Sequence, residues 1–158
     1  MGVKASAETL RSIPLFADCD PVHLQVLAFS AQRHDFAPGE HLVTQGSKGL
    51  AAFLVLDGLV DIFRDDGGRQ EALGEAGPGA LIGEIAMIAD RTYSITAVAR
   101  FAVQSVLIDR TLFMRVAAEY PEFGARVFRA IVKRLDGSVA GFSEIKHTFD
   151  RARSFSNL

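Results

Sequence analysis

The sequence has little cysteine and no long apolar run. Cys19 is the single cysteine among 158 residues, so no disulfide can form within the chain, and we expect a reducing, cytoplasmic environment. No apolar run approaches the ~18 residues that a membrane-spanning helix needs. Residues 1–6 also lack the apolar core of a secretory signal. We therefore expect no membrane partner.

The chain also lacks an excess of positive charge. Lysine and arginine total 17 against 19 aspartate and glutamate residues, which gives a formal net charge of −2. Domains that hold a phosphate backbone usually carry a strong basic bias. In addition, only about twenty residues follow Leu135, which is too few for a helix-turn-helix unit. We therefore do not expect direct DNA binding.

The motifs of several enzyme classes are missing. The glycine-rich stretch GEAGPGALIG at 74–83 lacks the Gly-Lys-Ser/Thr ending of a P-loop, and no serine lies in a G-x-S-x-G motif. The four histidines show no metal-ligand spacing, and a lone cysteine cannot build a thiolate site. The pair Asp65-Asp66 is interpreted as a hairpin turn. We predict a protein that is not an enzyme and that holds neither metal nor cofactor.

The composition is that of one globular domain, with 49% hydrophobic and 23% charged residues. We predict a single domain over 1–158 with helices at 5–31, a β-region at 33–108 and further helices at 110–155. In the first zone, Pro14 interrupts the helix, and Asp18 or Asp20 can cap a second helix that has Pro21 in its first turn. The apolar face of that second helix consists of Leu24, Leu27 and Ala28.

The β-region consists of short β-rich runs that alternate with glycine-rich turns. The runs are HLVTQ, AFLVLDGLVDIFR, EALGEA, SITAVA and VQSVLI. The turns lie at 38–39, 46, 57–58, 65–68 and 77–79. Many short strands at roughly 8–12-residue spacing predict an all-β barrel, roll or sandwich.

Helical spacing of apolar residues returns in the last zone. Two stripes precede and follow Pro121, formed by Leu112, Val116 and Ala117, and by Phe123, Val127, Ala130, Ile131 and Leu135. A narrower seam at alternating spacings of three and four consists of Phe142, Ile145, Phe149 and Ala152. Two interpretations stay open for this seam: a homodimer formed through the 138–155 helix, or packing on the chain's own domain.

The order of these zones and several residues of the β-region resemble a known family. The opening LRSIPLFADCD is followed by FAPGEHLVTQGSKGLAAFLVLDGLVDIFRDDGG. This segment places Gly39, Glu40, Gln45, Gly46 and Gly58 in register with the cyclic nucleotide-binding domain family, which includes the catabolite activator protein and the Fnr-type regulators. The resemblance implies a mainly β fold with flanking helices. That fold is a double-stranded β-helix, or jelly-roll-like β-roll, plus N-terminal helices and a C-terminal helix pair.

The segment GPGALIGEIAMIAD resembles the start of the family's phosphate-binding segment. Gly83 followed by a short helix can aim the amides of Glu84, Ile85 and Ala86 at an anion, because a helix N-terminus carries a partial positive charge. The resemblance implies that Glu84 accepts a hydrogen bond from the ribose 2′-hydroxyl of a cyclic nucleotide. The alternative is a carboxylate that only caps the helix.

The family's phosphate-binding arginine has two candidate positions here. An ungapped alignment, which we prefer, lays YSITAVA at 93–99 on the frequent family string Arg-Ser-Ala-Thr-Ala-Val-Ala, so that Tyr93 stands at the arginine position. With a deletion of two residues, Arg91 takes that role instead, and it stays a candidate under either alignment. Thr92 and Ser94 can donate hydroxyl groups to the phosphate. Ser138 lies near the place where a hydroxyl of the family's long C-terminal helix contacts the base.

Two functions are compatible with these residues. The first is a regulatory module that binds a cyclic nucleotide, cAMP rather than cGMP, and couples binding to movement of the C-terminal helices. Arginine can hold phosphate oxygens with two parallel hydrogen bonds, and tyrosine cannot. The alternative is therefore a degenerate family member that has lost nucleotide binding and serves as a dimerisation or partner-docking module.

Overall fold

In the computed structural model, residues 3–135 are described, and they begin with three helical segments. These are the helix α1 (Val3–Arg11), the 3-10 helix η1 (Pro14–Phe16) and the helix α2 (Pro21–Ser30). Asp20, rather than Asp18, caps α2: its carboxylate accepts a hydrogen bond from the Val22 amide at 2.9 Å, and Pro21 occupies the first helical position. The predicted apolar face of α2 is buried.

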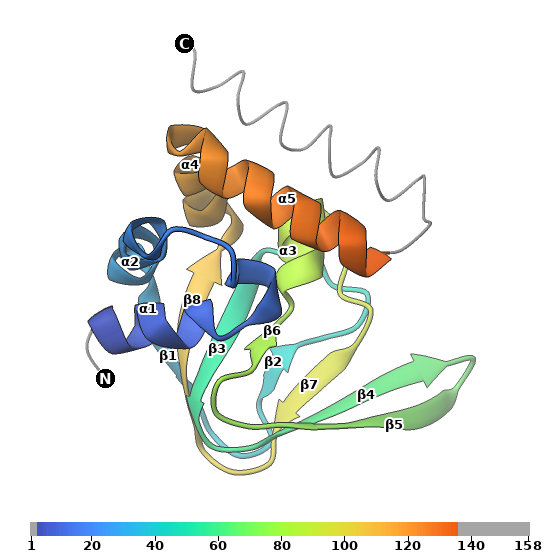
Figure 1. The fold of residues 1–158 in the computed structure, drawn as a ribbon. Helices are drawn as coiled ribbons and strands as arrows, with labels where there is room; N and C mark the ends of the chain where they lie inside the picture. The colour runs from blue at the N-terminus through green and yellow to red at the C-terminus, as the bar shows by residue number, and fades with distance from the viewer. Residues whose placement is uncertain (1–2, 136–158) are drawn as a thin grey trace.

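Eight strands follow, arranged in two four-stranded antiparallel sheets with the orders β1-β8-β3-β6 and β2-β7-β4-β5. Their bounds are β1 (Gln32–Phe36), β2 (His41–Val43), β3 (Ala51–Asp57), β4 (Val60–Asp66), β5 (Arg69–Ala76), β6 (Leu81–Ile82), β7 (Thr96–Ala99) and β8 (Val103–Asp109). The β4–β5 hairpin extends away from the rest of the roll (Figure 1). The predicted fold class, a β-roll with flanking helices, is confirmed.

Three helices complete the described chain: α3 (Glu84–Ala89), α4 (Arg110–Glu119) and α5 (Pro121–Leu135). Asp109 caps α4 by accepting a hydrogen bond from the Leu112 amide at 2.6 Å. The helices α1, α2, α4 and α5 gather on one side of the roll (Figure 1). The predicted seam of the 138–155 helix lies outside the described residues, and the division of 1–158 as one domain stays a prediction.

Strand β3 separates two hydrophobic cores. Side chains alternate across a strand, so Ala52 and Leu54 face the helices, whereas Phe53 and Val55 face the interior between the two sheets. All four side chains are at least 93% buried. This position explains why the β3 sequence AAFLVL is apolar throughout and does not alternate. Burial of each large apolar side chain contributes roughly 1.5–3 kcal/mol to folding.

Two residues of the family pattern, Glu40 and Gln45, make hydrogen bonds that hold turns and strands in place. The Glu40 carboxylate accepts a hydrogen bond from the Ala37 amide at 2.7 Å and so closes the turn before β2. The Gln45 side chain donates to the Asp65 carbonyl oxygen at 2.9 Å and accepts from the Asp65 amide at 2.7 Å. These contacts fix the chain after β2 to the end of β4.

Candidate ligand-binding site

Helix α3 begins directly after a glycine in the left-handed conformation. Gly83 precedes it with φ 86° and ψ 9°, a left-handed conformation that costs glycine little. The first bond of the helix runs from the Met87 amide to the Gly83 carbonyl oxygen at 3.1 Å. The amides of residues 84–86 therefore precede the internal hydrogen-bond ladder of the helix.

The predicted site residues of the 91–94 segment lie beside this helix. The Arg91 amide donates to the Ala86 carbonyl oxygen at 2.9 Å, which holds the segment against α3. Arg91 is half-buried, and Thr92 and Ser94 are exposed. The structure therefore brings residues 83–86 and 91–94 together. Ser138 lies outside the described residues.

Residues 46–49 support the 91–94 segment from its other side, which the sequence analysis did not anticipate. The Gly46 amide donates to the Tyr93 carbonyl oxygen, the Tyr93 amide to the Ser47 carbonyl oxygen and the Gly49 amide to the Arg91 carbonyl oxygen, each at 2.9 Å. Lys48 pairs with Thr92 in an isolated antiparallel bridge. The stretch GSKGL at 46–50 was the sequence signal for this contact, because its two glycines permit the backbones of the two segments to approach closely.

The Tyr93 side chain points into the core between the sheets. It is 8% exposed, and its ring lies against Gly83, where an added Cβ atom would come within 2.8 Å of the ring atom Cε1. The Tyr93 hydroxyl donates to the Ala51 carbonyl oxygen at 2.5 Å and accepts from the Ala51 amide at 3.2 Å. The phenol therefore ties the start of β3 to the segment that leads into β7.

The Tyr93 side chain does not carry the positive charge that an arginine at position 93 would carry. Burial raises the pKa of the Tyr93 phenol, so the side chain is neutral at physiological pH. Its hydroxyl already donates to the protein backbone. Within the 83–94 segment, Arg91 is the residue with a cationic side chain.

Arg110, a residue that the sequence analysis missed, connects α3 to α4. It is the first residue of α4, and its guanidinium donates to the carbonyl oxygens of Met87 and Ile88, the latter at 3.1 Å. Its Nε atom lies 3.7 Å from a carboxylate oxygen of Asp90. A cation at a helix C-terminus complements the dipole of that helix. A single arginine after a strand gives no recognisable sequence signal for this contact.

Two kinds of feature are not found in the described part of the chain. Among residues 3–135, no group of three histidine, cysteine or carboxylate side chains is placed to hold a metal ion. Within the same range, no helix is both long enough and apolar enough to cross a bilayer.

The fold agrees with comparison to known proteins. A family model described as the cyclic nucleotide-binding domain matches residues 33–120, which include all eight strands except the first residue of β1. The chain belongs to the cyclic nucleotide-binding domain family.

Several relatives whose names state an activity are longer proteins, and this chain aligns with only a part of each. The cyclic AMP receptor protein of Thermus thermophilus is 27% identical over 127 residues, which cover 80% of this chain and 59% of that protein. The chain thus spans less than two thirds of the length of the curated relatives it matches. A cAMP-binding acyltransferase from Mycobacterium smegmatis is 29% identical with a TM-score of 0.56, and the match covers 84% of this chain and 41% of the acyltransferase.

A solved structure of similar extent is the N-terminal domain of a transcriptional regulator from Streptomyces coelicolor. It aligns with a TM-score of 0.73 at 27% identity and covers 84% of this chain and 95% of that domain. The β-roll and the flanking helices of this chain therefore have a counterpart in one domain of a transcriptional regulator.

Proposed function

We propose that this chain is a regulatory module that binds a cyclic nucleotide, cAMP in preference to cGMP, between the start of α3 and the 91–94 segment. The observation that carries the proposal is the hydrogen bond between the Arg91 amide and the Ala86 carbonyl oxygen. This bond anchors the backbone of a cationic residue to α3, the helix whose first amides follow Gly83. The printed name of the Thermus thermophilus relative, a cyclic AMP receptor protein, supports the choice of nucleotide.

Each site residue has a role in this proposal. The amides of residues 84–86 receive the cyclic phosphate, because they precede the hydrogen-bond ladder of α3 and the helix dipole favours an anion there. Glu84, which is half-buried, accepts from the ribose 2′-hydroxyl. Arg91 neutralises the phosphate, and the exposed hydroxyls of Thr92 and Ser94 add donors. Ser138 is proposed to contact the base.

Coupling to the C-terminal helices passes through Arg110 in this proposal. A ligand changes a conformational equilibrium only when it binds one state more tightly than the other. The ligand contacts the first turn of α3, and Arg110 holds the last turn of the same helix to the start of α4. A shift of α3 on binding would therefore move α4 and, through it, α5. We infer a regulator rather than an enzyme, in a cytoplasmic setting.

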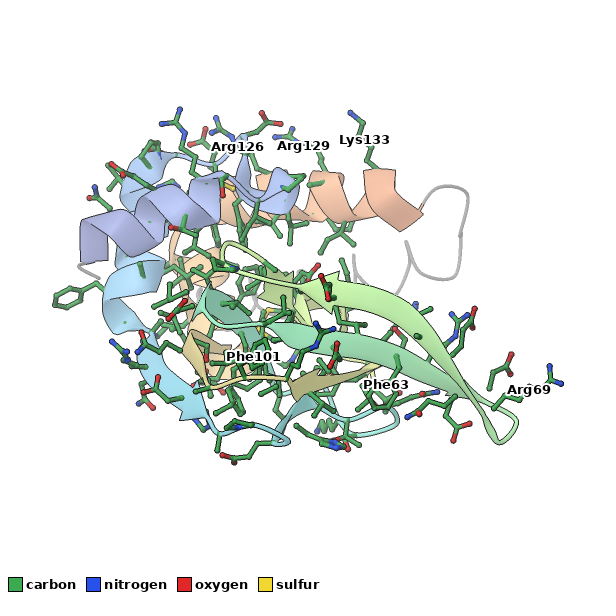
Figure 2. All side chains as sticks on the ribbon, turned by 90° about the horizontal axis from the view of Figure 1, so that it is seen from below. Phe63, Arg69, Phe101, Arg126, Arg129 and Lys133 are labelled. Carbon is green, nitrogen blue, oxygen red and sulfur yellow. The ribbon has the colours of Figure 1, made fainter. Side chains whose placement is uncertain are left out.

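Titration calorimetry with cAMP and cGMP tests the ligand. We expect the wild-type chain to bind cAMP, and we expect Arg91→Ala to lower its affinity about 100-fold, because a charge-assisted hydrogen bond to phosphate contributes about 2–3 kcal/mol. Arg69→Ala is the matched control, since Arg69 lies at the exposed tip of the β4–β5 hairpin (Figure 2). A flat trace at millimolar cAMP would reject the proposal.

The packing of Tyr93 favours a second candidate, a degenerate member that keeps the fold and serves as a dimerisation or docking module. The Tyr93 ring lies against Gly83, and its hydroxyl is bonded to Ala51. If this ring excludes the nucleotide, Tyr93→Arg should raise the affinity for cAMP by about 100-fold, because it supplies the missing charge.

A Tyr93→Phe variant provides the control for that test. It keeps the ring and removes the hydroxyl, so it should weaken folding by about 1 kcal/mol without creating cAMP binding. Calorimetry on both variants, with a thermal melt to confirm folding, separates added charge from loosened packing. The absence of any gain with Tyr93→Arg would count against the second candidate.

A further inference from the structure

A groove of about 750 Å³ lies between η1 and α5, away from the proposed nucleotide site. Its apolar lining comes from Pro14 and Leu15 of η1 and Ala130 of α5. Its charged lining, among the described residues, comes from Arg126, Arg129 and Lys133 of α5, opposed by the carboxylate of Asp18. The groove therefore concentrates positive charge on a chain whose net charge is −2.

The three cations form a row along one side of α5. Their spacings of three and four residues place them on one helix face, and seven residues at about 1.5 Å each span roughly 10 Å. Figure 2 shows the labelled Arg126, Arg129 and Lys133 side chains in sequence along α5, on the side turned away from the sheets. A row of cations of this length can contact several negative charges of one elongated ligand.

Arg126 and the other two cations have different roles. The Arg126 guanidinium donates to the Asp18 carbonyl oxygen at 2.6 Å and to the Glu122 carboxylate at 2.9 Å. The bond to Asp18 fixes the connection between η1 and α2 to α5 and thereby holds one end of the groove in place, whereas Glu122 lies on α5 itself. Arg129 and Lys133 are both exposed, so their charges are accessible to a partner.

We propose that this groove, defined by Pro14, Leu15, Ala130, Arg126, Arg129 and Lys133, docks an acidic amphipathic segment of a partner protein. Carboxylates of the partner pair with Arg129 and Lys133, and an apolar side chain enters between Pro14 and Ala130. The volume accommodates several side chains and exceeds what a single small anion fills. Pairing with a row of opposite charge also fixes the orientation of the partner segment.

The chemistry of the groove favours a peptide over a nucleic acid. A nucleic-acid groove combines many cations with aromatic rings on which bases stack. Here three cations line the groove with proline, leucine and alanine, and no aromatic residue belongs to the described lining. The apolar surface is suited to an aliphatic side chain between carboxylates.

Fluorescence anisotropy on the full chain tests the proposal with a labelled synthetic peptide of glutamate and leucine. The peptide, of about 15 residues, carries glutamate at helical spacings of three and four with leucine between them. We expect saturable binding at low ionic strength that weakens severalfold as the salt concentration rises, because the recognition charges are exposed. Arg129→Glu with Lys133→Glu should lower the affinity at least about tenfold.

Charge reversal elsewhere is the matched control. Arg33→Glu with Arg69→Glu makes the same change in net charge on exposed residues of β1 and β5, and it should leave the affinity within about twofold. Arg129→Gln with Lys133→Gln, which removes charge without reversing it, should produce an intermediate loss. Thermal melts establish that all variants remain folded.

Three results would overturn the proposal. The first is no binding of the peptide at low salt, and the second is an equal loss of affinity with the control pair. The third is equal binding of a lysine-for-glutamate peptide or of a single-stranded oligonucleotide of similar length. Equal binding of the lysine peptide would mean that the groove does not select for acidic side chains. Equal binding of the oligonucleotide would mean that it recognises phosphate.

Discussion

Gly49→Ala is expected to lower the free energy of unfolding by about 3 kcal/mol, since it overfills a tightly packed backbone contact. A Cβ atom at position 49 would lie 2.6 Å from the Arg91 carbonyl oxygen, 2.7 Å from the Ala86 carbonyl carbon and 2.8 Å from the Ala86 Cβ atom. Two of these neighbours are backbone atoms, which cannot rotate away. The chain at 86 or 91 must therefore move.

The same substitution should also weaken nucleotide binding. The backbone that it displaces belongs to α3 and to the Arg91 segment, whose mutual placement carries the proposed site. Positions that are misplaced by about 1 Å can cost a site about two orders of magnitude in function. Calorimetry with cAMP on the folded fraction measures this effect.

Gly77→Ala provides the matched control for Gly49→Ala. The nearest atoms to a Cβ at position 77, outside its chain neighbours, are the Gly58 carbonyl oxygen and Leu59 Cδ1, both at 3.9 Å. This separation is ordinary van der Waals contact, so we expect a change within about 0.5 kcal/mol. Urea denaturation gives both values. Equal stability of the two variants would contradict the packing that the structure shows around Gly49.

Phe123→Ala is expected to destabilise the protein by about 3–5 kcal/mol, the usual effect of removing a buried phenylalanine ring. Phe123 is 0% exposed and joins three elements to α5. Its ring centroid lies 5.6 Å from that of Phe113 on α4, 6.3 Å from that of Phe16 on η1 and 6.2 Å from that of His23 on α2. The closely packed rings around the resulting cavity would collapse into it only in part.

Phe101→Ala is the control for this prediction. Phe101 is 59% exposed and lies in the turn between β7 and β8, and Figure 2 labels it beside the sheets. Its removal should change the free energy of unfolding by no more than about 0.5 kcal/mol. The shift of the urea midpoint at constant slope compares the variants. A small effect at Phe123 would mean that α5 does not depend on this aromatic cluster.

Local signals in the sequence were sufficient for the helices. The sequence predicted the start of α2 from Pro21 and a cap at Asp18 or Asp20, because a carboxylate cap and a proline in the first turn need only neighbouring residues. The structure selects Asp20. The α4 stripe at 112, 116 and 117 is buried as its spacing indicated. Pro14 interrupted the first helix as predicted, and it also begins the 3-10 helix that the sequence analysis did not identify.

Two strands had no local signal. Strand β1, QRHDF, exposes four of its five residues and forms by pairing with β8 from Gln32–Leu107 to Phe36–Val103. Strand β6 contains two residues and is defined by its pairing with β3. Partners that lie far away in the chain determine both strands. The hydrophobic alternation of a single segment therefore could not predict them.

The sequence by itself determined the family, the glycine that starts α3, the candidate ligands at 84–86 and 91–94, and the presence of tyrosine at the preferred arginine position. These conclusions depend on short motifs whose chemistry is local. Only the tertiary structure decided that the Tyr93 ring packs against Gly83 and bonds to Ala51. It also decided that Arg110 holds α3, and that η1 and α5 form a basic groove. Each of these contacts joins residues that are distant in the chain, and the packing of the whole roll determines which of them meet.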